Sequence, residues 1–454
     1  MPYDYDLLIR AGQLIDSALP EDIALDIAVR EGRIVALGEA LPGSAAQTLD
    51  AQGLTVLPGV VDAHVHFNEP GRSHWEGIAT GSAAHAAGGG TVFVDMPLNS
   101  HPPVLDEASF QAKLEAMQAR SHCDFALWGG LTPDSLEHMD ALAACGVIGF
   151  KAFMSKTGTD DFQAADDAVL YQGMTIAARH GLLVAVHAES YTLTMQFAQA
   201  LRAQGRSDAA AYCASRPILA ECEAISRALL LAKESGCALH VVHVSSAAGV
   251  ALIAKAKAEG VNVTCETCPH YLHFSQEDLE ARGAVLKCAP PLRPQTEVAA
   301  LWQTLLEGTI DFIASDHSPC PPELKDKADF FDIWGGITGI QFSLPVMLSQ
   351  AAQRGLPLAK LSTLMATAPA QRLRLANKGR IALGYDADLV CVDREASYSL
   401  SAADLRQRHP HSPYLGQPLQ GRVQHTLLRG RSIYQNGQLG EAGSAKLLTP
   451  APLP

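Results

Sequence analysis

Eight short apolar runs of strand length recur between about residues 58 and 375, and this regular recurrence constrains the fold most strongly. Segments with the periodicity of amphipathic helices lie between them, for example at 224–234 and 298–306. Eight repeats of strand then helix favour a closed parallel barrel over an open sheet. The predicted fold class is therefore α/β, with a TIM (β/α)₈ barrel. The predicted strands are 60–66, 91–96, 124–128, 147–153, 183–187, 239–244, 261–266 and 312–316.

The first of these runs carries two histidines. It reads Val-Val-Asp-Ala-His-Val-His-Phe and contains a His-x-His pair, His64 and His66. Side chains alternate between the two faces of a strand, so both imidazoles point the same way, about 7 Å apart along the strand. Two imidazoles directed into an apolar interior need a shared partner, and a metal ion is the simplest one. A lone His-x-His is a weak signal, because the chain has 17 histidines.

Four later runs carry further residues of metal-ligand type at or near their ends. Polar residues at the carboxyl ends of successive buried strands are typical of the active face of a (β/α)₈ barrel. Side chains from the first, fourth, fifth, sixth and eighth strands can converge only if the sheet closes. The four residues are Lys151, His187, His243 and Asp316.

Lys151 is the most informative of the six, because lysine is almost never fully buried without a partner. One interpretation is a buried salt bridge. The other is carbamylation: burial lowers the pKa of the ammonium, and the neutral amine adds CO₂ to form a carbamate whose two oxygens can bridge two cations. Four imidazoles, one carbamate and one carboxylate exceed the three protein ligands of a single catalytic zinc. The set predicts two divalent metal ions bridged by carbamylated Lys151, with zinc preferred and cobalt, manganese or iron as alternatives.

The two ends of the chain differ from the middle. Residues 26–38 and 379–392 each contain short strand-like runs separated by turns. The same pattern at both ends predicts one small β-sandwich-like domain built from residues 1–57 and 380–454. The barrel, residues 58–379, is then inserted between the two segments.

Composition disfavours several functional classes. The chain has 454 residues, a hydrophobic fraction of 48% and a net charge of −14 that is spread without blocks. We therefore expect a small-molecule substrate and no nucleic-acid or membrane partner. The acidic first residues lack the basic region of a signal peptide. No apolar stretch approaches the roughly 20 residues that a membrane span needs. The ten cysteines are scattered along the chain and do not suggest a disulfide framework. These features favour a reduced, cytoplasmic protein.

Three other features receive structural interpretations. Cys265 and Cys268 form a Cys-x-x-Cys pair, but no second pair accompanies them, which disfavours a zinc or redox role. The glycine-rich run at 86–91 precedes a strand, which favours a tight turn over a phosphate-binding loop. His240 has the opposite strand parity to His243 and is interpreted as a packed or exposed histidine.

The motifs together resemble those of the amidohydrolase superfamily, and specifically its cyclic amidases: dihydroorotases, hydantoinases and allantoinases. The resemblance covers essentially the whole chain, including both terminal segments. In that family the His-x-His pair, a carbamylated lysine, two later histidines and a final aspartate bind a binuclear metal centre. The resemblance also implies a homo-oligomer, commonly a tetramer. The matching positions are His64, His66, Lys151, His187, His243 and Asp316.

Within this group, the segments 67–77, 95–100 and 331–339 look most like those of the allantoinase branch. Dihydroorotases usually carry an arginine two residues after the second histidine, where this chain has Asn68. A neutral amide there forfeits the bidentate contact to a carboxylate and suits a neutral, ureido-bearing substrate better. Hydantoinases tend to carry an aspartate there and a tyrosine shortly after the lysine, whereas this chain has Ser155 and Lys156.

The resemblance thus implies metal-dependent hydrolysis of the cyclic amide of allantoin to allantoate. Asp316 is the expected catalytic group, which takes a proton from the attacking water and delivers it to the leaving ring nitrogen. The alternatives are a hydantoinase or dihydropyrimidinase, a dihydroorotase, and more remotely a non-enzymatic assembly module, which the presence of all six ligand types disfavours. The loop 286–293 is a candidate for backbone contacts to the substrate. Candidate substrate-binding residues are Asn68, Asn99, Cys288 and Ser318.

Overall fold

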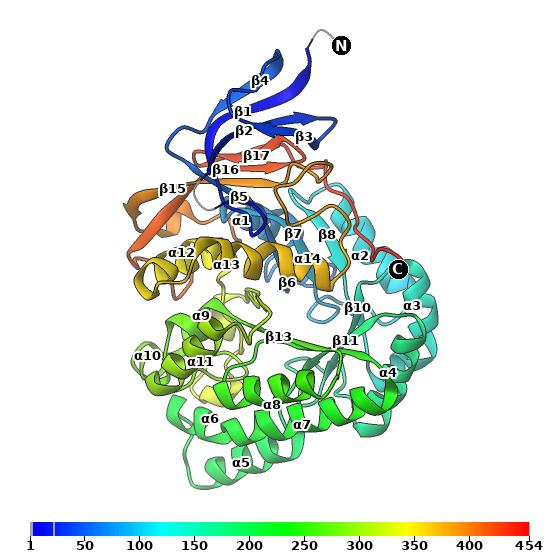
Figure 1. Ribbon diagram of the computed structural model, residues 1–454. Helices are drawn as coiled ribbons and strands as arrows, with labels where there is room; N and C mark the ends of the chain where they lie inside the picture. Colours follow the sequence, from blue (N-terminus) through cyan, green and yellow to red (C-terminus); the bar gives the residue numbers. More distant parts are fainter. Residues whose placement is uncertain (1–2, 21–22, 454) are drawn as a thin grey trace.

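The computed structural model describes residues 3–20 and 23–453. Its centre is a ring of short parallel strands with helices around it (Figure 1). These strands are rich in Val, Phe and Ala and are mostly buried along their whole length, as expected where helices cover a parallel sheet. The ring strands are β6 (Val60–Val65), β7 (Gly90–Asp95), β8 (Asp124–Leu127), β9 (Gly129–Gly130), β10 (Gly149–Phe153), β11 (Leu183–His187), β12 (Ala238–Val241), β13 (Val263–Thr267) and β14 (Phe312–Ile313).

Two parallel sheets make up the ring. One has the order β14-β13-β12-β11-β10-β9 and the other the order β6-β7-β8. Hydrogen bonds join the sheets at both edges: the Ile148 N–H donates to the Leu127 carbonyl (2.9 Å), and the His66 N–H donates to the His317 carbonyl (2.8 Å). Only one residue separates β8 from β9, so these two share one strand position. The predicted strands all appear within the described ranges, and the prediction of a (β/α)₈ barrel is confirmed.

The helices follow from local sequence signals. In α7 (Ile218–Ser235) the buried side chains include Ala224, Ile225, Ala228 and Leu229, which recur at helical spacing and form one apolar stripe. Full burial of a side chain such as Ile225 contributes about 2 kcal/mol. The other helices are α1 (Ile78–Ala87), α2 (Glu107–Gln118), α3 (Met139–Cys145), α4 (Asp167–Arg179), α5 (Tyr191–Ala203), α6 (Ala209–Ser215), α8 (Ala247–Ala258), α9 (Pro269–His273), α10 (Gln276–Arg282), α11 (Gln295–Glu307), α12 (Ser343–Arg354), α13 (Leu358–Ser362) and α14 (Ala368–Arg372). Among the helices of the described residues, none combines the length and the apolar character needed to cross a bilayer.

A further sheet brings the two ends of the chain together on one side of the barrel (Figure 1). Its order is β18-β17-β16-β15-β5-β1-β2-β3, with β4 beside β1, and the antiparallel pair β5 and β15 joins the N-terminal half to the C-terminal half. The predicted division of the chain into residues 58–379 and a terminal domain stays a prediction, and positions 1, 2, 21, 22 and 454 of that domain lie outside the described residues. The strands are β1 (Tyr5–Leu14), β2 (Ile23–Arg30), β3 (Arg33–Gly38), β4 (Ala45–Asp50), β5 (Thr55–Pro58), β15 (Leu389–Tyr398), β16 (Leu419–Leu428), β17 (Arg431–Gln435) and β18 (Gln438–Leu439).

The C-terminal segment leaves this sheet and runs along the barrel. The Phe125 N–H donates to the Lys446 carbonyl (3.0 Å), and the Leu448 N–H donates to the Phe125 carbonyl (2.7 Å). The Ala451 N–H donates to the Arg374 carbonyl (2.9 Å). Figure 1 shows the C-terminus beside α2 and α3. The final residues therefore add backbone hydrogen bonds to β8 and to the segment after α14.

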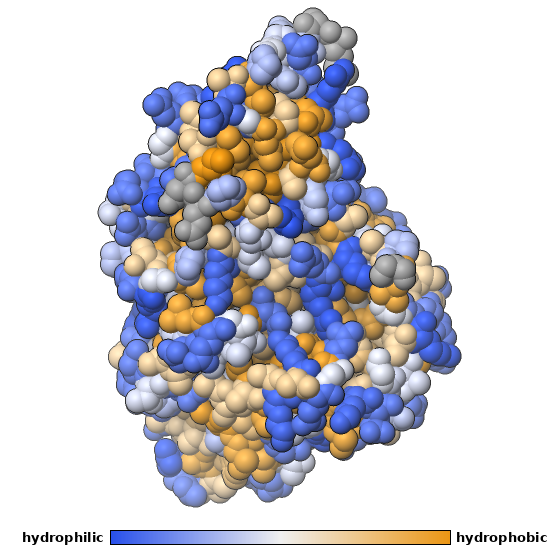
Figure 2. Space-filling view, viewed as in Figure 1, coloured by the Kyte–Doolittle hydropathy of each residue, from blue (hydrophilic) through white to orange (hydrophobic). Residues whose placement is uncertain are grey.

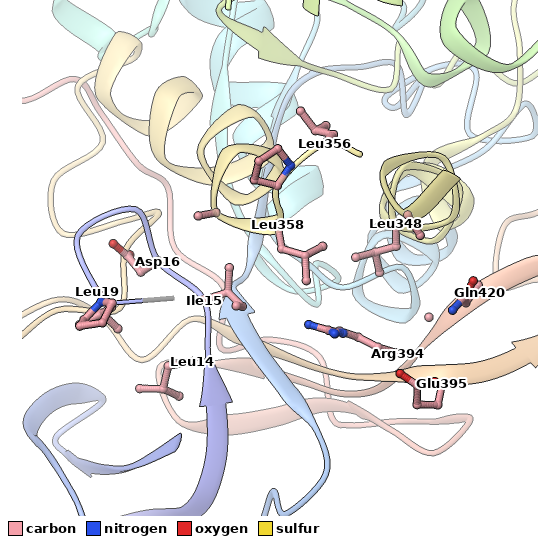
Figure 3. Close-up of a pocket in the computed structure, with 15 residues that line it drawn as sticks. Leu14, Ile15, Asp16, Leu19, Leu348, Leu356, Leu358, Arg394, Glu395 and Gln420 are labelled. Carbon is pink, nitrogen blue, oxygen red and sulfur yellow. The ribbon is translucent and has the colours of Figure 1, made fainter. Parts of the chain in front are cut away.

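A cavity of about 290 Å³ lies where the terminal sheet meets α12 and α13 (Figure 3). Leucines from the sheet side, Leu14 and Leu19, and from the helix side, Leu348 and Leu358, line it. Hydrophobic residues also gather on the surface over the terminal sheet (Figure 2). None of the six predicted ligands lines this cavity, so it belongs to the junction between sheet and helices.

A buried ion cluster ties the terminal segments to the barrel. The Nζ atom of Lys378 lies 2.7 Å from Asp124 at the start of β8, 2.9 Å from Asp386 and 2.6 Å from Asp388 just before β15. Burial alone would lower the pKa of Lys378, but the three carboxylates raise it above its ordinary value. Arg429, in the turn before β17, also bonds Asp124. The three carboxylates are close enough to hold a cation, and the ammonium of Lys378 is that cation.

We expect Lys378→Met to lower the free energy of unfolding by about 3–5 kcal/mol, because it leaves the buried carboxylate of Asp388 without its cation and removes one of the two cations at Asp124. Denaturant unfolding followed by circular dichroism measures this loss. Arg179→Met is the control, since it removes a cation from an exposed pair with Asp140 and should change stability little. Equal stability losses in the two variants would contradict the role of the cluster.

Candidate metal centre

The six predicted ligand residues lie together at the carboxyl ends of the ring strands. They come from β6, β10 and β11 and from the segments that follow β6, β12 and β14. In a closed parallel barrel these ends face one common mouth. All six side chains are buried: His64, His66, Lys151, His187, His243 and Asp316.

His64, His66 and Asp316 form what we call the first half-site. The Nε2 atom of His64 lies 3.2 Å from Oδ1 of Asp316, and the Nε2 atom of His66 lies 3.5 Å from the same oxygen. All three ligand atoms are within 4.8 Å of one another. Donors on one tetrahedral zinc, with bonds of about 2.0–2.1 Å, lie about 3.3 Å apart. The spacing of the first half-site therefore fits one divalent cation.

His187 and His243 form the second half-site. The Nδ1 atom of His187 lies 3.0 Å from the Nε2 atom of His243, a separation that also fits two donors on one cation. His187 stacks on Phe153, with ring centroids 4.6 Å apart and planes at 11°. The ring centroids of His243 and His64 are 5.4 Å apart, so the two half-sites are neighbours.

Two of the six residues have an unusual backbone conformation. The φ angles of His243 and Asp316 are 41° and 44°, in the left-handed region that residues other than glycine seldom adopt. Such a conformation costs about 1–3 kcal/mol and persists only where the surroundings enforce it. His243 lies two residues after the end of β12 at Val241, and Asp316 lies three residues after the end of β14 at Ile313. The left-handed turn thus sets the direction of each side chain at the mouth of the barrel.

Lys151 lies close to both half-sites, since its charge acts on His64, His187 and His243. Burial lowers the pKa of Lys151 to about 8, and the carboxylates of Asp316 and Glu266 oppose that change. Within the described part of the chain its Nζ atom has no hydrogen-bond partner, so the hydrogen-bonded salt bridge considered from the sequence is not formed there. A buried unpaired amine beside histidine nitrogens fits carbamylation, because a carbamate supplies the missing ligand oxygens.

Two buried carboxylates contact the histidines and were not predicted from the sequence. Glu266 Oε1 lies 2.6 Å from His64 Nδ1, and Glu189 Oε2 lies 2.8 Å from His187 Nε2. Burial raises the pKa of Glu266 to about 8, although Lys151 opposes the shift. Burial would also raise the pKa of Glu189, but Arg216 and His187 bring it down to about 2.

The sequence contains a signal for only one of these carboxylates. Glu266 lies inside β13, between buried strands of the ring, and a glutamate in a buried strand needs a partner, as a lysine does. Glu189 follows β11 in a connecting segment, where glutamate is common. His240, interpreted as packed or exposed, is buried, with its Nε2 atom 3.1 Å from Glu266 and its ring stacked on Phe312.

A cleft of about 980 Å³ opens onto both half-sites. This volume is at the upper end of the range for small-molecule sites, and the cleft has room for a small ring with substituents. Two of the four candidate substrate-binding residues, Asn99 and Ser318, line it. Lys287 and Ala289 also line it, so the loop 286–293 reaches the cleft.

The other two candidates for substrate binding, Asn68 and Cys288, are not among the residues that line the cleft. The Asn68 side chain is buried, and its Nδ2 atom donates to the Pro319 carbonyl (3.3 Å). Cys288 is also buried, and its carbonyl accepts a hydrogen bond from the Tyr212 hydroxyl (2.9 Å). Their contact with substrate stays a prediction.

Two lysines, the buried Lys287 and the half-buried Lys325, hold one wall of the cleft. Burial lowers the pKa of Lys287 to about 7 and that of Lys325 to about 8. Both donate hydrogen bonds to the loop that contains Trp334 and Gly335, which line the cleft. The lysines therefore fix the shape of this wall through its backbone. The accepting carbonyls are those of residues 331 and 333 for Lys287, and of residues 334 and 336 for Lys325.

Comparison with known proteins agrees with this geometry. The sequence matches the amidohydrolase family over residues 55–433. It is 51% identical to an allantoinase from Rubrobacter xylanophilus, over 98% of each chain, and 52% identical to one from Deinococcus radiodurans, over 99% of each chain. Among solved structures it is similar to an L-hydantoinase (dihydropyrimidinase) from Arthrobacter aurescens, with a TM-score of 0.95, 35% identity, and coverage of 98% of this chain and 100% of that one.

The chain belongs to the amidohydrolase family. This agrees with the family resemblance of its motifs and with the observed barrel.

We expect Lys151→Met to retain fewer metal ions than the unaltered protein, because it removes the buried amine that would become the carbamate between the half-sites. Metal analysis after gel filtration should find about two divalent ions per chain in the unaltered protein and fewer than about one in the variant. Lys156→Met is the control: Lys156 lines the cleft in the segment after β10, and its loss should leave the metal content unchanged. Equal metal contents in all three proteins would contradict the ligand role of Lys151.

Proposed function

We propose that this member of the amidohydrolase family is an allantoinase, which hydrolyses the cyclic amide of allantoin to allantoate. The proposal includes two divalent ions, with zinc the first choice, held by the two half-sites and by carbamylated Lys151. Amidohydrolase membership and the curated relatives make the chain a hydrolase of cyclic amides. The substrate assignment is supported by the near-full-length similarity to proteins named allantoinase.

The observation that carries the chemistry is the convergence of five donor groups and one buried amine at the mouth of a single barrel. The donor set of imidazoles and carboxylates suits zinc and other first-row divalent ions. When bound, such ions polarise a carbonyl oxygen and lower the pKa of water, which makes water a nucleophile at neutral pH. The cleft beside the half-sites gives a small ring access to them.

In the proposed reaction, the oxygen of water adds to the ring carbonyl carbon and the carbon–nitrogen bond of the ring then breaks. Asp316 lies at the centre of the first half-site and lines the cleft, so its carboxylate can accept the proton that the water loses. It then returns that proton to the leaving nitrogen. The products of this step are a carboxylic acid, which releases its remaining proton to solvent and becomes the carboxylate, and a ureido N–H, and Asp316 is regenerated.

The cleft provides contacts for the substituent of the ring. Asn99 and Ser318 line it and offer an amide and a hydroxyl, which can donate to or accept from a ureido group. Trp75 and Trp334 also line it, with ring centroids 4.6 Å apart, and present apolar surface that excludes water from the bound ring.

A hydantoinase or dihydropyrimidinase is the second candidate. The observation that favours it is the TM-score of 0.95 to the L-hydantoinase from Arthrobacter aurescens. Fold similarity at 35% identity supports shared chemistry more than a shared substrate. The homotetramer and the cytoplasmic location expected from the sequence stay predictions.

We expect Asp316→Asn to lower kcat by about 10³-fold or more while the fold is kept, because an amide cannot take up the proton from water. Steady-state kinetics with allantoin and the thermal midpoint of unfolding measure the two effects. Asp134→Asn makes the same chemical change on the surface and should leave kcat unchanged. A near-normal kcat in Asp316→Asn would reject the proton-transfer role.

We expect kcat/KM for allantoin to exceed the values for hydantoin, dihydrouracil and dihydroorotate by at least about 100-fold, because only allantoin carries a ureido substituent on its ring for the polar cleft residues to bind. The assay uses purified protein with each substrate separately. Asp316→Asn prepared in parallel excludes a contaminating activity. A higher value for hydantoin or dihydrouracil would transfer the assignment to the second candidate, and no turnover of any of the four would reject the proposal.

A further inference from the structure

We propose that Glu266 and Glu189 are positioning residues, each of which fixes one histidine in one half-site. Glu266 acts on His64 in the first half-site, and Glu189 acts on His187 in the second. Neither carboxylate lines the cleft, so neither is placed to touch substrate. The inference rests on the proposed binuclear centre and does not depend on which cyclic amide is hydrolysed.

Glu266 holds His64 from inside the barrel. Its Oε1 atom lies 2.6 Å from Nδ1 of His64, and its Oε2 atom lies 3.1 Å from Nε2 of His240. His240 is itself fixed, by a 2.9 Å contact from Nδ1 to the hydroxyl of Thr264. The charge of bound divalent ions would favour the ionised form of Glu266, which only accepts hydrogen bonds and would place the hydrogen of His64 on Nδ1. The lone pair of its Nε2 atom then faces Asp316.

Glu189 holds His187 in the complementary way. Its Oε2 atom lies 2.8 Å from Nε2 of His187, and the guanidinium of Arg216 bonds the same oxygen. The hydrogen of His187 therefore lies on Nε2, and the lone pair of Nδ1 faces His243. The two anchored histidines thus present different ring nitrogens, and in each case the carboxylate selects which one is free.

The second histidine of each half-site has no such anchor. The Nδ1 atoms of His66 and His243 are buried and, within the described ranges, have no hydrogen-bond partner. Each half-site therefore pairs one histidine that is fixed from behind with one that is not. A carboxylate behind a ligand histidine sets its tautomer and orientation and raises its basicity, and losing such a partner costs about 10–100-fold in metal affinity.

The test is zinc affinity in Glu266→Gln and Glu189→Gln. Glutamine keeps the side-chain volume, but its neutral amide is a weaker acceptor and does not dictate the tautomer of the imidazole. Competition with a zinc chelator over a range of free zinc measures both sites. We expect each variant to bind one of the two ions about 10–100-fold more weakly and the other ion normally. The double variant should bind both ions more weakly.

A second set of variants assigns each carboxylate to its half-site. His66→Ala weakens the first half-site on its own. Glu266→Gln should add little further loss in that background, because both changes affect the same ion, whereas Glu189→Gln should weaken the remaining ion. The reverse pattern is expected in a His243→Ala background.

Glu221→Gln is the matched control. Glu221 is also a buried carboxylate, but it accepts hydrogen bonds from Ser245 and Ser246 and touches none of the six ligand residues. It should lose stability and keep both zinc affinities. If a glutamine variant at 266 or 189 fails to fold, aspartate at that position is the second variant. Its side chain keeps the charge but is one methylene shorter, so it should show the same weaker binding of one of the two zinc ions.

Unchanged zinc affinities in the variants at 266 and 189 would overturn the inference, and so would an equal loss in Glu221→Gln. These measurements use no substrate. A failure to hydrolyse allantoin would therefore reject the proposed activity and leave the positioning roles standing. An unaltered chain that binds no zinc would overturn both the centre and this inference.

Discussion

Closure of the parallel strand ring is the constraint on which the site depends. His64 comes from β6 and Asp316 from the segment after β14, and each strand lies at the edge of its own sheet. In an open sheet those edges would be far apart. The hydrogen bond from the His66 N–H to the His317 carbonyl closes the gap, and the Ser315 N–H donates to Asp62 (3.1 Å) across the same junction. The 3.2 Å contact between His64 and Asp316 is thus a consequence of topology.

Burial then shifts the histidines and Lys151 toward their neutral forms. Desolvation lowers the pKa values of His64 and His243 well below the ordinary value for histidine, and it lowers that of Lys151 to about 8. The neutral imidazole is the form that binds metals, and the neutral amine is the form that adds CO₂. The interior therefore brings neutral imidazole nitrogens close together, as at the 3.0 Å contact between His187 and His243. A cation is the natural partner of such an arrangement.

The barrel and the proximity of the six residues could be predicted because both follow from periodicity. Apolar runs of strand length marked the strands, and the positions of His64 and Asp316 at their ends marked the mouth. The backbone conformations of His243 and Asp316 could not be predicted, since the surrounding packing imposes them. The hydrogen bonds from Lys287 and Lys325 to backbone carbonyls could not be predicted either, because the periodicity of apolar residues does not indicate tertiary contacts between loops. The substrate contacts were the weakest part of the prediction for the same reason, since only the folded structure determines which loop residues face the cleft.

The two half-sites are anchored to different parts of the molecule. Glu266 connects the first half-site to His240 and Thr264 inside the barrel. Glu189 connects the second half-site to Arg216, which lines the cleft. Glu189 therefore contacts both His187, which it orients, and Arg216, which belongs to the wall of the substrate cleft. A substitution of Arg216 made to change the substrate would also remove the cation that holds Glu189. Of the described side chains that hydrogen-bond the Glu266 carboxylate, only that of His64 lines the cleft. Substrate preference and metal retention are physically linked on one side of this centre and separable on the other.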